Sequence, residues 1–149
     1  METPVHLSHK PIVHVKDYKS KDAQFSNDSD ARSLSIGLAQ WDKEKDLIDR
    51  AISAKVWRYD TNNSKWSRQS EELPMHRVLD LSILLMASLI KDQNIDLPDS
   101  TLGETIISSE EENFKYIYKY YQKNKTKFDP RVKELDRLIK KFMEKERIK

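Results

Sequence analysis

The sequence predicts an α+β fold: a small antiparallel meander of three to four strands packed on a central buried helix, plus two C-terminal helices. Segments 33–41 and 51–59 alternate apolar and polar residues with the period of a strand. Segment 74–93 is apolar around most of its circumference, as in a helix that is buried on most sides. Segments 109–127 and 129–147 then repeat apolar residues at helical spacing.

The composition fits one cytoplasmic domain. The chain has 149 residues, enough to bury a single core, and its lack of cysteine favours a reducing compartment. Its 27 basic and 25 acidic residues leave a net charge of +2, without the strong basic excess of a general nucleic-acid-binding protein. The longest apolar run, 78–90, is interrupted by polar residues and is too short to span a bilayer. We therefore expect neither nucleic acid nor a membrane as a partner.

We expect a single domain over residues 1–149, divided into three parts. Residues 1–32 form an N-terminal arm that contains one short strand candidate at 11–15. Residues 33–93 form the sheet and the central helix, and residues 109–147 form the C-terminal helix pair.

The first strand of the sheet has two unlike faces. Its larger aliphatic residues share one face, which we predict to be the core side: Leu34, Ile36 and Leu38. The residues of the opposite face are small: Ser35, Gly37 and Ala39. Such a face leaves room either for a ligand to approach the backbone or for another element of the chain to cover it.

The second and third strands are predicted to form a hairpin. Residues 60–63 have the Asp and Asn side chains of a tight turn. A four-residue turn there places Trp57 opposite Trp66 and Lys55 opposite Arg68. Indoles stack on bases or sugars, and a guanidinium binds phosphate or carboxylate, so this face is a candidate ligand site. The alternative is that the C-terminal helices cover it.

The helix boundaries are predicted from prolines and capping residues. Pro74 suits the first helical position, because its missing N–H would have no partner there. Ser109 with Glu112 fits a capping box for the next helix. Asp129 and Pro130 fit the N-cap and first position of the last helix.

A hydrolytic site is a further hypothesis. Ser70, His76 and Asp80 supply the residue types of a catalytic triad, and the last two are four residues apart on one helical face. No glycine lies between Gly37 and Gly103 to shape a nucleophile elbow, which counts against this hypothesis. The alternative is that His76, Arg77 and Asp80 bond the ends of the sheet and the glutamates at 71 and 72.

Metal and cofactor sites are not expected. The three histidines nearest the N-terminus, His6, His9 and His14, lack the spacing of a helical zinc pair. The two glycines of the chain are too few for a phosphate-binding loop of the P-loop or dinucleotide type.

Three stretches, SIGLAQW at 35–41, ISAKVWR at 52–58 and KWSRQSEELPMHRVLDL at 65–81, resemble a family of bacterial proteins catalogued only as a domain of unknown function. The similarity covers roughly the first two thirds of the chain, from the strand at Lys10 through the central helix. This resemblance implies one intracellular domain, and it implies no mechanism.

Three functions follow in order of preference. The first is a non-catalytic binding or interaction module, with a second copy or another protein as partner. The second is a site for an anionic small molecule such as a nucleotide, built from cationic and aromatic residues: Lys55, Trp57, Trp66, Arg68 and Arg77. The third is a hydrolase that uses Ser70, His76 and Asp80. We lean away from an enzyme.

Overall fold

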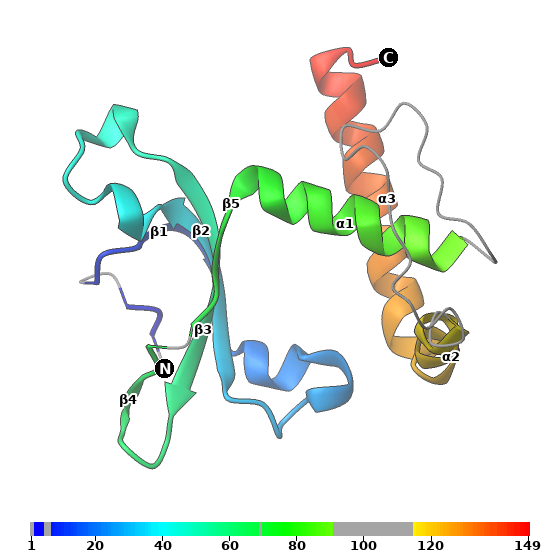
Figure 1. Cartoon of the computed structure of the whole chain (residues 1–149), viewed down its shortest axis with the longest axis horizontal. Coiled ribbons are helices and arrows are strands. Elements are labelled where there is room, and N and C mark those ends of the chain that lie inside the picture. Colours follow the sequence, from blue (N-terminus) through cyan, green and yellow to red (C-terminus); the bar gives the residue numbers. More distant parts are fainter. Residues whose placement is uncertain (1, 5–6, 69, 91–114) are drawn as a thin grey trace. The chain divides into compact units, whose positions relative to one another are not determined.

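The computed structural model describes residues 2–4, 7–68, 70–90 and 115–149, and it has the predicted α+β fold. The chain separates into two compact units, Met1–Leu84 and Leu85–Lys149. The first unit contains the sheet and the beginning of the helix that follows it, and the second contains the rest of that helix and the two C-terminal helices (Figure 1).

The sheet is antiparallel, as predicted, and has five strands: β1 (Lys10–Val15), β2 (Ala31–Leu38), β3 (Ile52–Asp60), β4 (Lys65–Trp66) and β5 (Glu72–Pro74). The strand order is β1-β2-β3-β4, and β5 also pairs with β3. Both short strands therefore pair with β3, which becomes the centre of the sheet.

The hairpin register differs from the predicted one. Trp66 pairs with Tyr59, instead of lying opposite Trp57. The turn is shifted because Asp60 remains in the strand and its Oδ1 accepts the N–H groups of Asn62 and Asn63 at 3.0 and 3.2 Å. A shift of two positions preserves the face on which a side chain lies.

The partner of Lys55 differs as well. Strand β4 ends at Trp66, so Arg68 lies beyond it, and Lys55 pairs with Glu72 of β5. The sheet thus brings an acidic residue opposite the lysine where the predicted hairpin had an arginine.

The buried face of β2 is the opposite of the predicted one. Small residues fill the buried positions of this strand: Ala31, Ser33, Ser35 and Gly37. Ile36, on the face predicted to be core, is 45% exposed. The reason is close backbone packing, since a Cβ added to Gly37 would lie 2.0 Å from the carbonyl oxygen of Lys10. Small side chains are needed where the N-terminal part of the chain approaches β2 this closely.

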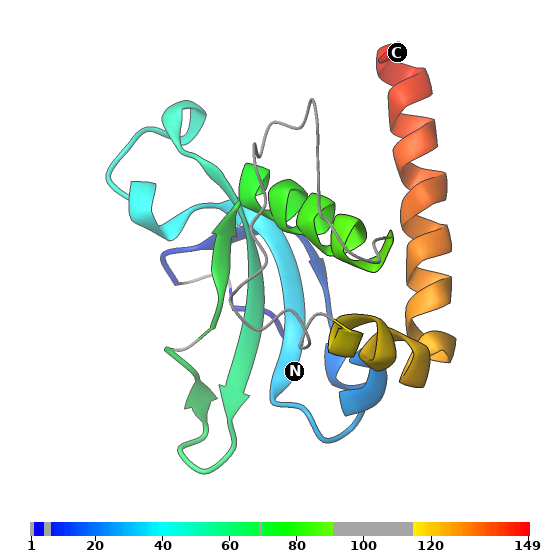
Figure 2. The same ribbon diagram turned by 45° about the vertical axis from the view of Figure 1, so that its right-hand side comes forward.

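Helix α1 (Met75–Ile90) begins one residue after the predicted start, directly from β5 (Figure 2). Its first turn lies beside the start of β3, where Met75 and Ile52 border the same cleft. The prediction that this helix is buried is wrong for most of its length: Ala87 is its buried residue, and Leu79 is 61% exposed. Apolar side chains around a helix indicate that other groups pack against it, but they do not identify those groups.

The predicted C-terminal helix pair is present as α2 (Lys115–Lys123) and α3 (Lys125–Glu146). Within this unit α2 crosses the N-terminal end of α3 at a steep angle (Figure 2). The last helix begins at Lys125 and includes Pro130, so the predicted start at Asp129 and Pro130 is wrong. Asp129 instead accepts hydrogen bonds from Tyr121 and from Lys125 Nζ.

Two further observations concern the helical elements. The capping box predicted at Ser109 and Glu112 lies outside the described residues. Among the residues that the structure describes, no helix has the length and apolar character needed to cross a bilayer.

The contact at Gly37 predicts a stability effect. Gly37→Ala should lower the free energy of unfolding by about 1–3 kcal/mol, because β1 has to move away from β2 to accept the methyl group. Ser64→Gly is the matched control, since Ser64 has a φ of 49°, which glycine adopts without strain. Urea unfolding should separate the two variants, and equal stability of Gly37→Ala and the natural chain would contradict the close packing.

Candidate functional site

A buried polar cluster lies on the small-residue face of the sheet, made of His9, Ser35, Ser53, Trp57 and Glu72. His9 and Ser53 are fully buried, Trp57 is 1% exposed and Ser35 is 4% exposed. The side chain of Glu72 is 11% exposed. His9 comes from the N-terminal arm and the other four from β2, β3 and β5. The cluster therefore joins the arm to three strands.

One arrangement of protons satisfies every contact in the cluster. Glu72 Oε1 accepts hydrogen bonds from His9 Nδ1 at 3.0 Å and from Ser53 Oγ at 2.7 Å. The N–H at His9 Nδ1 is shared with Ser53 Oγ, which also accepts it at 3.0 Å. His9 Nε2 is then the acceptor for the hydroxyl of Ser35 at 2.9 Å. Ser35 Oγ in turn accepts the indole N–H of Trp57 at 2.8 Å. This arrangement requires a neutral imidazole protonated on Nδ1.

The charge states agree with that arrangement. Burial lowers the pKa of His9, and the hydrogen bond to Glu72 opposes this shift without reversing it. Burial by itself raises the pKa of Glu72, but hydrogen bonds from the backbone N–H of Gln40, from Ser53 and from His9 outweigh it and hold that pKa below 4.5. At neutral pH the cluster therefore contains a neutral His9 and an ionised Glu72.

Lys55 lies beside the cluster and offsets the charge of Glu72. Its ammonium is 4.0 Å from the centre of the Trp57 ring, a cation–π contact. Burial lowers the pKa of Lys55, while the negative charge of Glu72 acts in the opposite direction. The lysine and the glutamate are register partners on β3 and β5.

The arm is held at two further places. Thr3 Oγ1 is 2.6 Å from Ser33 Oγ and 2.9 Å from His14 Nδ1, in a buried contact between the arm, β2 and β1. Arg50 Nη2 donates to the carbonyl oxygens of Ser8 and Ala39 at 3.1 and 3.2 Å. Together with His9, these contacts hold the N-terminal arm over the small-residue face.

The sequence Ser35, His9, Glu72 has the hydrogen-bond order of a catalytic triad. A nucleophile, however, has to meet a substrate carbonyl beside an oxyanion pocket. Ser35 is buried, and its Oγ is already engaged by both His9 and the Trp57 indole. The arrangement is therefore a satisfied polar core that fixes the arm, and within it the partly buried carboxylate of Glu72 borders a cleft.

The hydrogen bonds of Ser70, one residue of the hydrolase hypothesis, join it to its own turn and to β3. Ser70 Oγ donates to the carbonyl oxygen of Ser67 and accepts the backbone N–H of Arg58, both at 3.0 Å, as expected for a turn. In the described part of the chain, no hydrogen bond joins His76 to Asp80. Glu71 pairs with Arg58, away from His76.

The residues of the predicted ligand site lie at three different places in the structure. Lys55, Trp57 and Trp66 share one face, with the two indoles 5.8 Å apart edge to face, but Trp57 is buried. Arg68 is exposed beyond the end of β4. Arg77 lies on α1 and borders a separate cleft.

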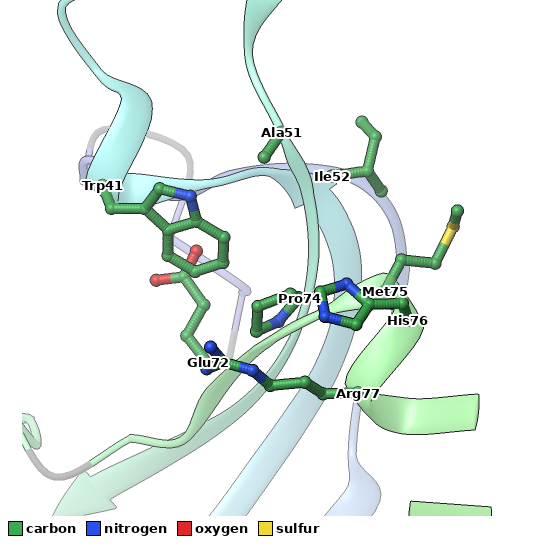
Figure 3. A pocket seen from close by; sticks show the side chains of 8 residues that line it. All are labelled: Trp41, Ala51, Ile52, Glu72, Pro74, Met75, His76 and Arg77. Carbon is green, nitrogen blue, oxygen red and sulfur yellow. The ribbon is translucent and has the colours of Figure 1, made fainter. Parts of the chain in front are cut away.

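This cleft opens at the junction of the sheet and α1 and has a volume of about 680 Å³ (Figure 3). Its lining combines apolar side chains with one acid, one imidazole and one guanidinium: Trp41, Ala51, Ile52, Glu72, Pro74, Met75, His76 and Arg77. Trp41 is 50% exposed, and His76 and Arg77 are exposed on the first turn of α1.

Hydrogen bonds on both sides of Trp41 hold it at the cleft. The backbone N–H of Gln40 donates to Glu72 Oε1 at 2.9 Å. Asp42 Oδ2 accepts the N–H of Ala51 at 2.8 Å. The loop that presents the indole is thus attached to β5 on one side and to the start of β3 on the other.

The carboxylate of Glu72 links the cluster to the cleft. Among the described residues, all of its hydrogen bonds fall on Oε1: those from His9, Ser53 and Gln40. Oε2 therefore remains available as an acceptor for a ligand in the cleft. Sequence reasoning missed this role, although serines at alternate positions of β2 indicate a polar partner across that face.

Metal chemistry finds no support in the described residues, where no group of three His, Asp or Glu side chains is placed to hold an ion. His9 and His14 bond the arm and the sheet, and His6 lies outside the described residues.

The family comparison covers the part of the chain that contains the cluster and the cleft. Residues 1–96 match the model of a family of unknown function, DUF6530. The chain belongs to this family. No curated protein and no solved structure matches this chain. The DUF6530 match includes β1 to β5 and α1, whereas α2 and α3 lie beyond its end.

The buried histidine predicts a pH effect on stability. Because the pKa of His9 is below its ordinary value of 6.5 in the folded chain, the unfolded chain binds a proton there first as the pH falls. The contribution of His9 is fully present above 6.5 and is lost as the pH falls from there through the folded pKa. The free energy of unfolding should therefore decrease as the pH falls below about 6.5.

His9→Gln tests this effect. It should lower stability at neutral pH by about 1–3 kcal/mol, by leaving buried partners unsatisfied, and should flatten the decrease toward acidic pH. His76→Gln changes an exposed histidine and should leave the slope intact. The pKa of Glu72 lies below 4.5, so its titration affects stability at a lower pH than that of His9 in the natural chain and in both variants. An unchanged slope in His9→Gln would contradict the neutral, buried imidazole.

Proposed function

We propose that this chain is a non-catalytic binding module whose ligand occupies the cleft between Trp41 and the first turn of α1. The ligand class that fits is a small anion with a planar ring, such as a nucleotide. The observation that supports this most directly is the meeting of an exposed indole, an imidazole and a guanidinium around one opening (Figure 3).

The anionic part of such a ligand is matched by the start of α1. The first N–H groups of a helix have no partner within the helix and carry a partial positive charge. No acidic residue occupies the first turn of α1. Arg77 adds a planar, permanently charged fork suited to phosphate or carboxylate.

The ring is matched by the opposite wall. Trp41 offers an exposed indole face, and stacking on an aromatic side chain contributes about 1–3 kcal/mol per base. Ile52 and Pro74 provide apolar contact. Glu72 Oε2 requires a donor, so the ring should carry an N–H group, because a ligand that is anionic throughout would be repelled by this carboxylate.

The charge state of Glu72 supports binding in preference to catalysis. A general acid or base needs a pKa near the working pH. Three hydrogen bonds hold the pKa of Glu72 below its ordinary range, so it acts as a fixed acceptor.

Ligand binding is testable with nucleoside monophosphates and thermal unfolding. A ligand at 100 times its Kd stabilises the folded chain by about 2.7 kcal/mol, which a thermal shift detects. Trp41→Ala and Arg77→Ala should each weaken binding by about ten-fold or more, through loss of stacking and of a charged hydrogen bond.

Arg68→Ala is the matched control for Arg77→Ala, because it removes the same exposed side chain away from the cleft. It should bind like the natural chain. Equal losses in the two arginine variants would favour the face of Lys55 and Trp66 as the site. The absence of any shift with all nucleotides at millimolar concentration would contradict a nucleotide-like ligand.

A further inference from the structure

Helix α3 has an apolar stripe along one side. Its members are separated alternately by four and three residues: Phe128, Val132, Leu135, Ile139 and Phe142. This is the a/d pattern of a coiled coil, in which such residues form the seam between helices. The last four members are between 37% and 57% exposed.

The residue types along the stripe fit two strands at its centre, where one of the three d positions is leucine and the outer two are Phe128 and Phe142. The a positions are Val132 and Ile139, both β-branched, and the d position between them is Leu135. In parallel coiled coils, β-branched residues at a with leucine at d favour two strands over three or four. Pro130 lies at an f position, on the side away from the seam, where it does not interfere with the contact.

The flanking positions agree with a parallel arrangement of two identical helices. In a parallel pair, each g residue faces the e residue five positions later on the other helix. Arg131 then faces Asp136 of the second copy, and Leu138 faces Met143 of the second copy. The first pair has opposite charges and the second is apolar, and the two-fold axis repeats both.

From this pattern we propose that α3 forms a parallel two-stranded coiled coil with α3 of a second copy of the chain. The partner is a second copy because both flanking pairs are complementary within a single sequence. Asp136 also pairs with Lys140 at 2.7 Å within the helix, and an exposed carboxylate can accept from both cations. This proposal is independent of the ligand cleft, since α3 lies beyond the DUF6530 match.

The mass of the full chain in solution tests the proposal. Sedimentation equilibrium should give a concentration-dependent mass that approaches twice the 17.6 kDa of the chain. A mass of one chain at all accessible concentrations would overturn the proposal.

Charge reversal distinguishes this geometry from other dimers. Arg131→Glu and Asp136→Arg should each raise the dimer dissociation constant about ten-fold or more by opposing like charges. The double variant restores opposite charges in a parallel pair and should recover the natural affinity to within a few-fold. Arg137→Glu, at an f position, makes the same change as Arg131→Glu away from the seam and should have no effect. Failure of the double variant to recover would exclude the parallel register.

Single cysteines provide a second readout, because the natural chain has none. Val132→Cys at an a position should form a disulfide-linked dimer on mild oxidation, since the two copies meet there across the two-fold axis. Arg137→Cys should not. Equal cross-linking at both positions would show random collision and would contradict the proposed seam.

Discussion

The fold of the first unit depends on a buried series of side-chain hydrogen bonds that runs from Trp57 through Ser35 and His9 to Glu72. The inner positions of β2 are serine, glycine and alanine, which offer the N-terminal arm little apolar area to bury, so the hydrophobic effect holds the arm weakly along this strand. Polar groups in a low-dielectric interior are costly when unpaired and strong when satisfied. The arm is therefore held by specific partners, and it cannot shift without leaving several of them unpaired.

The architecture could be predicted from the sequence, but the buried face of the sheet could not. Alternation, turn residues and helical periodicity predicted an antiparallel sheet, a following helix and two C-terminal helices, all of which are present. The choice of core face failed because aliphatic residues such as Ile36 were weighted above small ones, whereas close backbone approach at Gly37 decided the packing. The proline signal at Pro130 failed because an earlier turn of helix forms before it.

The candidate site was predictable only in part, for a similar reason. Arg77 was identified, and it lies at the cleft, while Trp41 and Glu72 were not recognised as its neighbours. Their proximity depends on pairings between distant segments, such as the N–H of Gln40 with Glu72, that no local pattern encodes. Glu72 belongs to both the polar cluster and the cleft. A ligand that bonds its second oxygen would therefore be connected to His9 and the arm, which couples occupancy of the cleft to the stability of the fold.

The tautomer and charge of His9 test this account most directly. Nitrogen-15 NMR of the imidazole should show a neutral ring, protonated on Nδ1 and unprotonated on Nε2, whose pKa is below its ordinary value of 6.5. An imidazole that titrates near 6.5, or one that carries its proton on Nε2 at neutral pH, would contradict the buried series of side-chain hydrogen bonds on which the arm, the sheet and the floor of the cleft depend.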